Sequence, residues 1–314
     1  ATAKPAAAPA KPAEPKRHPI DPMPEPLKIT VMLGGPSAER EVSLRSGAAV
    51  AQALRSLGHD VHELDPRGPD WTLAAGTQLV FLALHGTYGE DGTVQRELDA
   101  LGVPYTGCDA AASAVAFDKV LTKERCVAAG VPTPRHLVLT QPTSAWPAGW
   151  APPVVLKPVC QGSSVGLQMV DAADGLEAAV REALRHDRRV LMEPRIAGRE
   201  ATVGILADQA LPVIEVRPKQ GPLDYHNKYT KGATEYFLPA DFDAATTARI
   251  QAAALGAFRA VNGRDYARVD VMVQADGSPM VLEVNTLPGM TELSLLPMAA
   301  KAAGYSFAGV CQRM

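Results

Sequence analysis

A chain of 314 residues has room for two or three domains, and its 46% hydrophobic content allows a large buried core. The formal net charge of −3 and the sequence pI of about 6.2 give no electrostatic basis for binding nucleic acid. No apolar run approaches the ~20 residues that span a bilayer, so no membrane partner is expected. Four scattered cysteines, without zinc or disulfide spacing, indicate a reduced, cytoplasmic setting.

The first part of the chain predicts a tail followed by an open parallel sheet. Residues 1–27 are rich in alanine, proline and lysine, which is typical of a disordered, polyproline-like segment. Buried strands are expected at 29–33, 61–64 and 79–84, the third apolar on both faces as in a central parallel strand. A helix between the first two strands would have Ser43 as its N-cap. Such βαβ punctuation places ligands beyond the carboxyl ends of the strands.

The rest of the chain alternates between helical and strand patterns. Helices are expected at 119–129, 172–187 and 244–261, and strands at 154–158, 190–193 and 200–206. The stretch 216–240 is polar and rich in Gly, Pro, Tyr and Lys, which predicts a long loop that is functional or disordered. His59 and His62 are interpreted as surface residues rather than metal ligands.

A β-hairpin near the C-terminus carries the most chemistry. Segments 267–273 and 280–285 alternate apolar and polar residues around an Asp-Gly turn signal. Its polar residues are Arg268, Asp270, Glu283 and Asn285. If they share a face, the two carboxylates need a cation between them, and Mg²⁺ with nucleotide phosphates fits these oxygen ligands. An amphipathic hairpin with a solvated polar face is the alternative, and it is favoured for a hairpin considered alone.

Further polar groups follow the predicted strands. The loop containing Gly162, Ser163 and Ser164 offers N–H groups and hydroxyls to a phosphate, although it lacks the Walker lysine, and a simple turn is the alternative. Lys157 lies in an apolar strand and needs an anionic partner, which a phosphate supplies. Glu39, in the loop after the first strand, can bind an ammonium group or be a solvated loop charge.

Two more loops fit a ligand site. The loop 85–92 follows a buried strand at the expected ligand edge of the sheet, although a tight turn is the alternative. Gly289 follows the predicted metal strand, and a glycine there allows its N–H to approach a developing oxyanion.

Taken together, seven stretches resemble the D-alanine–D-alanine ligases of the ATP-grasp superfamily. They run in order from residue 34 to residue 297: GGPSAEREVSLRSG, LHGTYGEDG, DKVLTK, KPVCQGSSVG, HNKYTKGATEY, ARVDVMV and LEVNTLPGMTELSLLP. The resemblance implies an α/β fold, with a Rossmann-like open parallel sheet domain at 28–115. A two-domain ATP-grasp fold of α+β type would follow, with subdomains at 116–197 and 198–314.

The resemblance also implies a reaction. The carboxylate of one D-alanine attacks the γ-phosphate of ATP, giving D-alanyl phosphate and ADP. The amine of a second D-alanine then displaces phosphate, which yields D-alanyl-D-alanine for peptidoglycan precursor synthesis. Positioning and charge neutralisation carry such chemistry, so no covalent nucleophile is needed. Two Mg²⁺ or Mn²⁺ ions and a cytoplasmic homodimer are implied as well.

Roles for residues follow from the same resemblance. The metal ligands would be Asp270, Glu283 and Asn285. ATP contacts are implied for Lys119, Lys157, Gly162, Ser164, Val165, Glu193, Ile196, Glu200 and Lys228, with Glu193 and Ile196 at the adenine and Glu200 at the ribose. The first D-alanine would meet Glu39, which is linked to Ser163 and Tyr229, and would be placed by His85. Arg268 and the Gly289 N–H would stabilise the oxyanion, and Ser294, Leu295 and Lys228 would bind the second substrate.

Three features bear on these expectations. The Lys228-Tyr229 pair implies a dipeptide product, because ligases of this kind that make the D-alanyl-D-lactate ester replace it. Uncharged Cys160 and Gln161 stand where charged residues are common in the family, and the proline-rich tail is unusual. The alternatives are another ATP-grasp carboxylate–amine ligase and an inactive nucleotide-binding regulator. Phosphate release that depends on D-alanine would separate the enzyme from the regulator.

Overall fold

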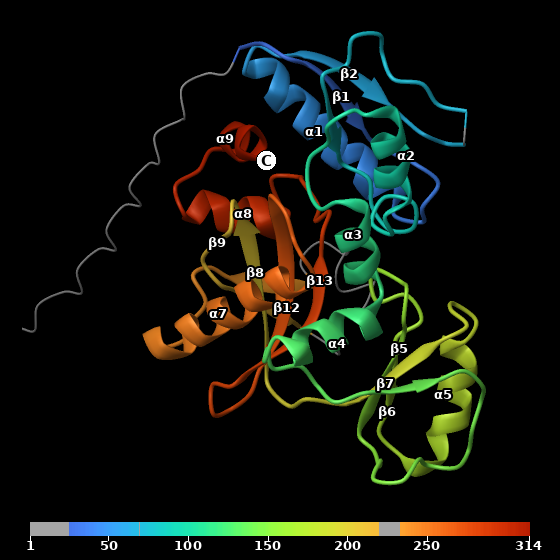
Figure 1. Ribbon diagram of the computed structural model, residues 1–314. Coiled ribbons are helices and arrows are strands. Elements are labelled where there is room, and N and C mark those ends of the chain that lie inside the picture. Colours follow the sequence, from blue (N-terminus) through green and yellow to red (C-terminus); the bar gives the residue numbers. More distant parts are fainter. Residues whose placement is uncertain (1–24, 69, 220–232) are drawn as a thin grey trace, which may run out of the picture.

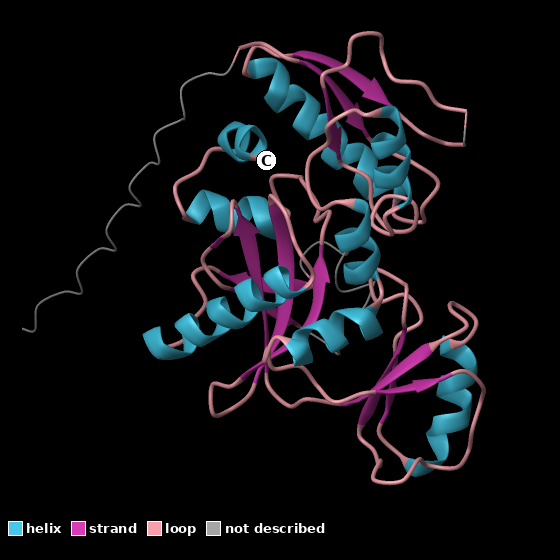
Figure 2. Cartoon of the chain, in the orientation of Figure 1, coloured by secondary structure: helices cyan, strands magenta, loops and turns pink. Residues whose placement is uncertain are grey.

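The computed structural model describes residues 25–68, 70–219 and 233–314. It contains three sheets, each covered by helices (Figures 1 and 2). The predicted tail lies mostly outside the described residues, and Lys228 and Tyr229 lie outside them entirely. No helix in the described ranges is long and apolar enough to cross a membrane.

The first sheet is parallel, as the βαβ pattern predicted. Its strands are β1 (Lys28–Met32), β2 (Asp60–Leu64) and β3 (Leu79–Leu82), in the order β2-β1-β3. The helices of this part are α1 (Arg40–Ser56), α2 (Thr93–Leu101) and α3 (Ala110–Phe117). The central strand is β1 rather than β3. Strand β3 pairs with β1 on one side, and on its other side Val80 forms an isolated bridge with Tyr105.

The predicted start of α1 was wrong. The helix begins at Arg40 with Glu39 in the N-cap position, so Ser43 lies inside the first turns. Ser43 is buried, and its hydroxyl donates to the Ala83 carbonyl (2.7 Å) while it accepts from the Gly34 N–H (2.8 Å). The serine therefore satisfies backbone groups after β1 and β3 instead of capping the helix.

One of the two histidines assigned to the surface is also buried. His62 is exposed on β2, as expected, but His59 is only 8% exposed. Its Nδ1 accepts a hydrogen bond from the Leu27 N–H (3.1 Å), and burial lowers its pKa. His59 thus closes the turn that leads into β2.

The second sheet is antiparallel and forms the central subdomain. Its strands are β4 (Leu137–Leu139), β5 (Val154–Pro158), β6 (Gln168–Val170) and β7 (Val190–Pro194), in the order β4-β7-β5-β6. Helix α4 (Lys119–Ala128) precedes it, and α5 (Leu176–Ala183) covers it. The helix predicted at 172–187 is therefore shorter, with a 3₁₀ turn at Ala173–Gly175 before it.

The third sheet forms the C-terminal subdomain. Its strands are β8 (Arg199–Leu206), β9 (Gln209–Ala210), β10 (Ile214–Pro218), β11 (Thr234–Phe237), β12 (Tyr266–Val273) and β13 (Pro279–Asn285). The order is β11-β10-β8-β12-β13, with β9 paired to β8, and α7 (Ala244–Ala260) packs on it. The predicted loop 216–240 was too long, because β10 and β11 pair with each other at its ends. Residues 220–232 lie outside the description.

The first and third sheets share a hydrophobic core. Helices α8 (Leu295–Ala302) and α9 (Phe307–Arg313) supply buried residues to the cluster that also holds β1 and β3. Helix α9 packs against α1, so the end of the chain returns to the first domain (Figure 1). This shared core fixes the loops after β1 and β3 relative to the loop after β13.

Candidate active site

The hairpin places its polar residues on one face. Strands β12 and β13 are antiparallel, with Asp270 opposite Glu283 and Arg268 opposite Asn285. Directly opposed residues project from the same side of a sheet. The turn between the strands has Gly277 at φ +79°, as the Asp-Gly signal predicted. The condition for a two-carboxylate site is therefore met.

Two cavities meet at this hairpin. One has a volume of about 230 Å³ and lies between the central and C-terminal sheets. The other, of about 770 Å³, extends toward the loops after β1 and β3. Glu200, Asp270 and Glu283 line both cavities, so the carboxylates stand at their junction. An acidic junction between two pockets suits a reaction that joins two bound molecules.

Hydrogen bonds from three residues hold the Asp270 carboxylate. It is 8% exposed and accepts two hydrogen bonds from Arg268, both 2.9 Å long. Thr202 on β8 donates to Oδ1 (2.6 Å) and the Asn285 amide donates to Oδ2 (3.2 Å). Burial alone would lower the pKa of Arg268, but Asp270 and then Glu283 outweigh it and raise that pKa. Arg268 is therefore a fixed cation beside the junction.

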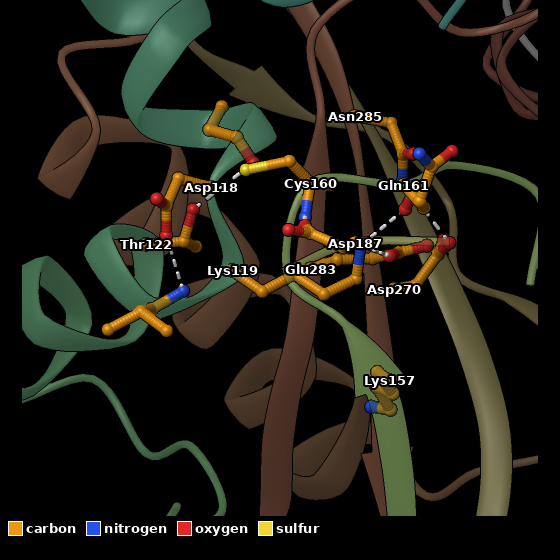
Figure 3. A network of polar contacts seen from close by, with 12 residues as sticks. Asp118, Lys119, Thr122, Lys157, Cys160, Gln161, Asp187, Asp270, Glu283 and Asn285 are labelled. Atoms are coloured by element: carbon orange, nitrogen blue, oxygen red, sulfur yellow. Dashed lines mark hydrogen bonds and ion pairs between the residues drawn. The ribbon is translucent and has the colours of Figure 1, made fainter. Parts of the chain in front are cut away.

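The donor atoms at the junction fit a hard divalent cation. Two carboxylates and an amide oxygen come from adjacent positions on β12 and β13, and these are the ligand types that Mg²⁺ takes. Glu283 Oε2 lies 3.6 Å from Lys119 Nζ, which supplies a cation on the central-subdomain side (Figure 3). The residues can hold a metal while lysine and arginine flank it.

The smaller cavity gathers most of the predicted nucleotide contacts. The residues that line it include Lys119, Lys157, Ser164, Val165, Glu193, Ile196 and Glu200, whereas Gly162 lines the larger cavity. Lys157 has a protein partner, since its Nζ lies 2.6 Å from Glu193 Oε2. The anionic group that a strand lysine requires is thus Glu193, and a phosphate would be a second partner. Burial opposes charge on Lys157, but Glu193 outweighs it and raises the lysine pKa.

The loop after β5 is held through its backbone by charged side chains from other parts of the chain. Lys119 Nζ donates to the Gln161 carbonyl (2.6 Å), and Asp187 accepts from the Cys160 N–H (2.7 Å) (Figure 3). The Gln161 side chain donates to the His186 carbonyl (3.0 Å). The two uncharged residues at 160 and 161 therefore still position the glycine–serine loop that follows.

The larger cavity collects the predicted substrate residues. Its lining includes Glu39, His85, Ser163, Arg268, Gly289, Ser294 and Leu295. Ser163 donates a short hydrogen bond to Glu39 Oε1, which joins the start of α1 to the glycine–serine loop. Ser163 and Ser164 both have positive φ angles, +51° and +58°, so the loop backbone turns sharply here. The Glu39–Ser163 link expected from the family resemblance is present.

His85 holds the loop after β13. It is buried, and its Nδ1 hydrogen bonds to the Leu287 carbonyl (2.8 Å), so Nδ1 carries the proton. Burial lowers the pKa of His85 despite the nearby Glu39 charge, which favours the neutral ring. Ser46 stands 3.4 Å from Nε2 and accepts from the Met290 N–H (3.0 Å). These contacts hold the backbone on both sides of Gly289.

Gly289 and Ser294 lie against each other. A Cβ on Gly289 would come within 2.8 Å of Ser294 Oγ, so only glycine leaves this approach open. Ser294 is the N-cap residue of α8, and its Oγ accepts from the Thr291 N–H (3.1 Å). The two residues assigned to the oxyanion and to the second substrate are therefore neighbours.

Several site residues were missed. Glu90 lines the larger cavity and accepts from the Gly86 N–H (2.6 Å). Burial, then the charge of Glu39, raises the pKa of Glu90 to about 8. Thr202, Ser46 and Lys123 also contact site residues. Glu90 stands in the loop 85–92 that the sequence singled out, but nothing local indicated that its carboxyl would be partly buried.

Comparisons with known proteins agree with this geometry. The family model "D-ala D-ala ligase C-terminus" matches residues 135–314, and "D-ala D-ala ligase N-terminus" matches residues 67–108. A D-alanine–D-alanine ligase of Methylacidiphilum infernorum is 45% identical, over 92% of this chain and 94% of that protein. One from Aquifex aeolicus is 45% identical, over 90% and 97%.

Solved structures give the same result. The D-alanine–D-alanine ligase of Bacillus anthracis is 34% identical, with a TM-score of 0.81, and covers 91% of this chain and 95% of that one. The VanG D-Ala:D-Ser ligase of Enterococcus faecalis is 28% identical, with a TM-score of 0.82, and covers 92% and 98%. Matched over both of its parts by the family models and over nearly its full length by these relatives, the chain belongs to the D-alanine–D-alanine ligase family.

Proposed function

We propose that this chain joins two D-alanine molecules to D-alanyl-D-alanine with cleavage of ATP to ADP and phosphate. The observation that carries this is the pairing of Asp270 with Glu283 at the junction of two cavities. One cavity has the lysines and carboxylates that a nucleotide needs, and the other has groups for a zwitterionic amino acid. The family membership supplies the substrate class.

The smaller cavity is the ATP site. A Bacillus anthracis ligase complexed with ATP, 31% identical with a TM-score of 0.78, shares this fold. Lys119 and Lys157 neutralise phosphate charge, and Ser164 and Val165 belong to the loop that covers the phosphates. Glu193 and Ile196 would lie at the adenine and Glu200 at the ribose. Glu200 also lines the larger cavity, which fits a residue at the ribose, because the ribose lies between the adenine and the phosphates.

Asp270, Glu283 and Asn285 would hold two Mg²⁺ or Mn²⁺ ions. When bound, the metal offsets the charge of the triphosphate and of the two carboxylates. The chain contributes the registered hairpin that presents all three ligands on one face, and Thr202 and Arg268 that fix Asp270.

The larger cavity binds the amino acids. Glu39 would take the ammonium group of the first D-alanine, and its hydrogen bond with Ser163 ties that substrate to the phosphate loop. Neutral His85 orders Leu287 and so presents the Gly289 N–H. Arg268 and that N–H would stabilise the negative charge that develops when the second amine attacks the acyl phosphate.

Ser294 and Leu295 would contact the second D-alanine at the start of α8. Lys228 would assist with its carboxylate and approach the γ-phosphate, and Tyr229 would join the link between Glu39 and Ser163. For these two residues the support is the family resemblance of the sequence. Their presence predicts an amine rather than a hydroxyl as the second nucleophile, hence a dipeptide. A role in peptidoglycan precursor synthesis follows from that product, and a homodimer stays a prediction.

The test is phosphate release with Mg²⁺ and ATP across D-alanine, D-serine, D-lactate and the L-amino acids. We expect release with D-alanine alone, accompanied by D-alanyl-D-alanine. D-Serine belongs in the panel because the VanG ligase, whose title names D-Ser, shares the fold. Release that is independent of D-alanine would refute the proposal. When D-alanine and D-lactate are supplied together at neutral pH, mainly ester product would refute the predicted dipeptide specificity.

A further inference from the structure

A buried lysine lies behind the nucleotide cavity without lining it. Lys123 is on α4, is 1% exposed, and forms an ion pair with Glu193 Oε1. Glu193 is 2% exposed, and its other oxygen pairs with Lys157 at 2.6 Å. Lys157 and Glu193 line the smaller cavity but Lys123 does not. Two cations therefore hold one carboxylate, one from the cavity side and one from behind.

Lys123 also contacts the segment between α4 and β4, which hydrogen bonds to β13. Its Nζ donates to Thr133 Oγ1 (2.7 Å) and to the Pro134 carbonyl (2.9 Å). Thr133 in turn donates to the Val281 carbonyl (2.8 Å), and the Val281 N–H donates to the Pro132 carbonyl (2.8 Å). Val281 is on β13, two residues before Glu283. The Lys123 ammonium group thus contacts both Glu193 of the central sheet and Thr133, which is hydrogen bonded to the proposed metal-binding strand β13.

Burying these charged groups costs free energy unless their ion pairs and hydrogen bonds compensate in full. Burying a lysine ammonium disfavours its charged form, and burial lowers the pKa of Lys123 although Glu193 opposes this. Glu193 also has its pKa lowered, because Lys157 and Lys123 together outweigh its burial. A well-packed apolar pair could fill the same space at no loss of stability. The charges instead give the Glu193 carboxylate a fixed position and orientation.

We propose that Lys123 is a positioning residue for the nucleotide. It fixes Glu193, and through Thr133 it sets the distance between that carboxylate and Glu283 at the other end of the cavity. This rests on the proposed function, which makes the cavity the ATP site. The Glu193 carboxylate can only accept hydrogen bonds. At the adenine end of the cavity it therefore selects an adenine amino group, which donates, over a guanine carbonyl oxygen, which accepts. Lys123 would therefore determine both nucleotide affinity and base selection without touching the nucleotide.

The test compares Lys123→Met with a matched variant, Arg199→Met. Arg199 pairs with Glu215, which is also 2% exposed, but neither residue lines a cavity described above. Both changes remove a cation from a buried carboxylate and are expected to lower the unfolding temperature. Calorimetric titration with Mg²⁺-ADP and Mg²⁺-GDP then separates the two. For Lys123→Met we expect ADP affinity to fall about 10- to 100-fold and the preference for ADP over GDP to shrink. The KM of Lys123→Met for D-alanine should stay within about twofold of wild type. For Arg199→Met, the ADP affinity, the preference for ADP over GDP and the KM for D-alanine should all stay within about twofold of wild type.

A double variant shows whether Lys123 acts through Glu193. If it does, Lys123→Met combined with Glu193→Gln binds ADP no more weakly than Glu193→Gln alone. ADP affinity and base preference that stay at wild-type values in Lys123→Met would overturn the assignment, and so would losses that multiply in the double variant. If Lys123→Met does not fold, Lys123→Gln keeps donors for Thr133 and Pro134 and carries the same expectations. Wild-type protein that binds ADP but releases no phosphate with D-alanine would refute the proposed reaction and leave the titrations to decide on Lys123.

Discussion

Replacing Asp270 with asparagine removes one charge at the junction of the two cavities. Arg268 would keep at most one of its two hydrogen bonds, because one Asp270 oxygen becomes an NH₂ group. That NH₂ group would face a donor from Arg268 and a second donor, from Thr202 if it replaces Oδ1 or from Asn285 if it replaces Oδ2. The variant therefore leaves a partly buried guanidinium without its hydrogen-bonded counter-charge.

The expected loss of stability follows from this geometry. Breaking a buried pair by removing one partner costs about 3–5 kcal/mol. At about 2–4 °C per kcal/mol, the unfolding midpoint should fall by roughly 6–20 °C. The turnover rate should also fall, because the loss of a metal ligand removes several kcal/mol of charge stabilisation. A loss of about 4 kcal/mol corresponds to roughly 10³-fold in rate.

The assay must separate these two effects. Glu215→Gln is the matched control, since Glu215 is buried and accepts from Arg199 and Arg217 outside both cavities. It should lose comparable stability and keep kcat. Phosphate release is measured at 25 °C with circular dichroism confirming that both variants are folded, and Mg²⁺ is titrated for each. Asp270→Asn with wild-type turnover and an unchanged Mg²⁺ requirement would refute the metal assignment.

Three further predictions concern neighbouring groups. The pKa of Glu90, about 8 against an ordinary 4.5, means that the folded form binds more protons between these pH values. Stability should therefore fall by a few kcal/mol as pH rises from 4.5 to 8, and denaturant titrations of Glu90→Gln should lack this slope. Ser163→Ala, which cuts the link to Glu39, should raise the KM for D-alanine about tenfold and leave ADP affinity near wild type; an unchanged KM would contradict the link. Glu283→Ala should abolish phosphate release with little change in unfolding temperature, since it also relieves repulsion with Asp270.

The elements that the sequence predicted well are those with local patterns. The period-two alternation at 267–273 and 280–285, with Gly277 at the turn, predicted the hairpin, whereas the shared face of its polar residues was a condition that the structure meets. The strands at 214–218 and 234–237 were missed because they are short and pair across a long insertion. The start of α1 was misplaced since Ser43 bonds to backbone groups that arrive from β1 and β3.

The residues of the candidate site also divide into those that local patterns predicted and those that depend on distant parts of the chain. Asp270 and Glu283 could be placed on the two strands of one hairpin from the sequence because a single turn joins these strands, and the register that pairs them comes from the structure. The Glu39–Ser163 contact spans 124 residues, and only the family resemblance anticipated it. Lys157 was recognised as needing an anion, but its partner Glu193 comes from a neighbouring strand whose pairing no local pattern reveals. The partial burial of Glu90 likewise depends on elements distant in the sequence.

The most direct measurement is the anomalous scattering of Mn²⁺ in crystals grown with ADP. The account predicts manganese within about 2.0–2.3 Å of carboxylate oxygens of Asp270 and Glu283, with the diphosphate on the same ion and the adenine toward Glu193. Nucleotide bound in the smaller cavity with manganese elsewhere, or with none at the hairpin, would contradict it.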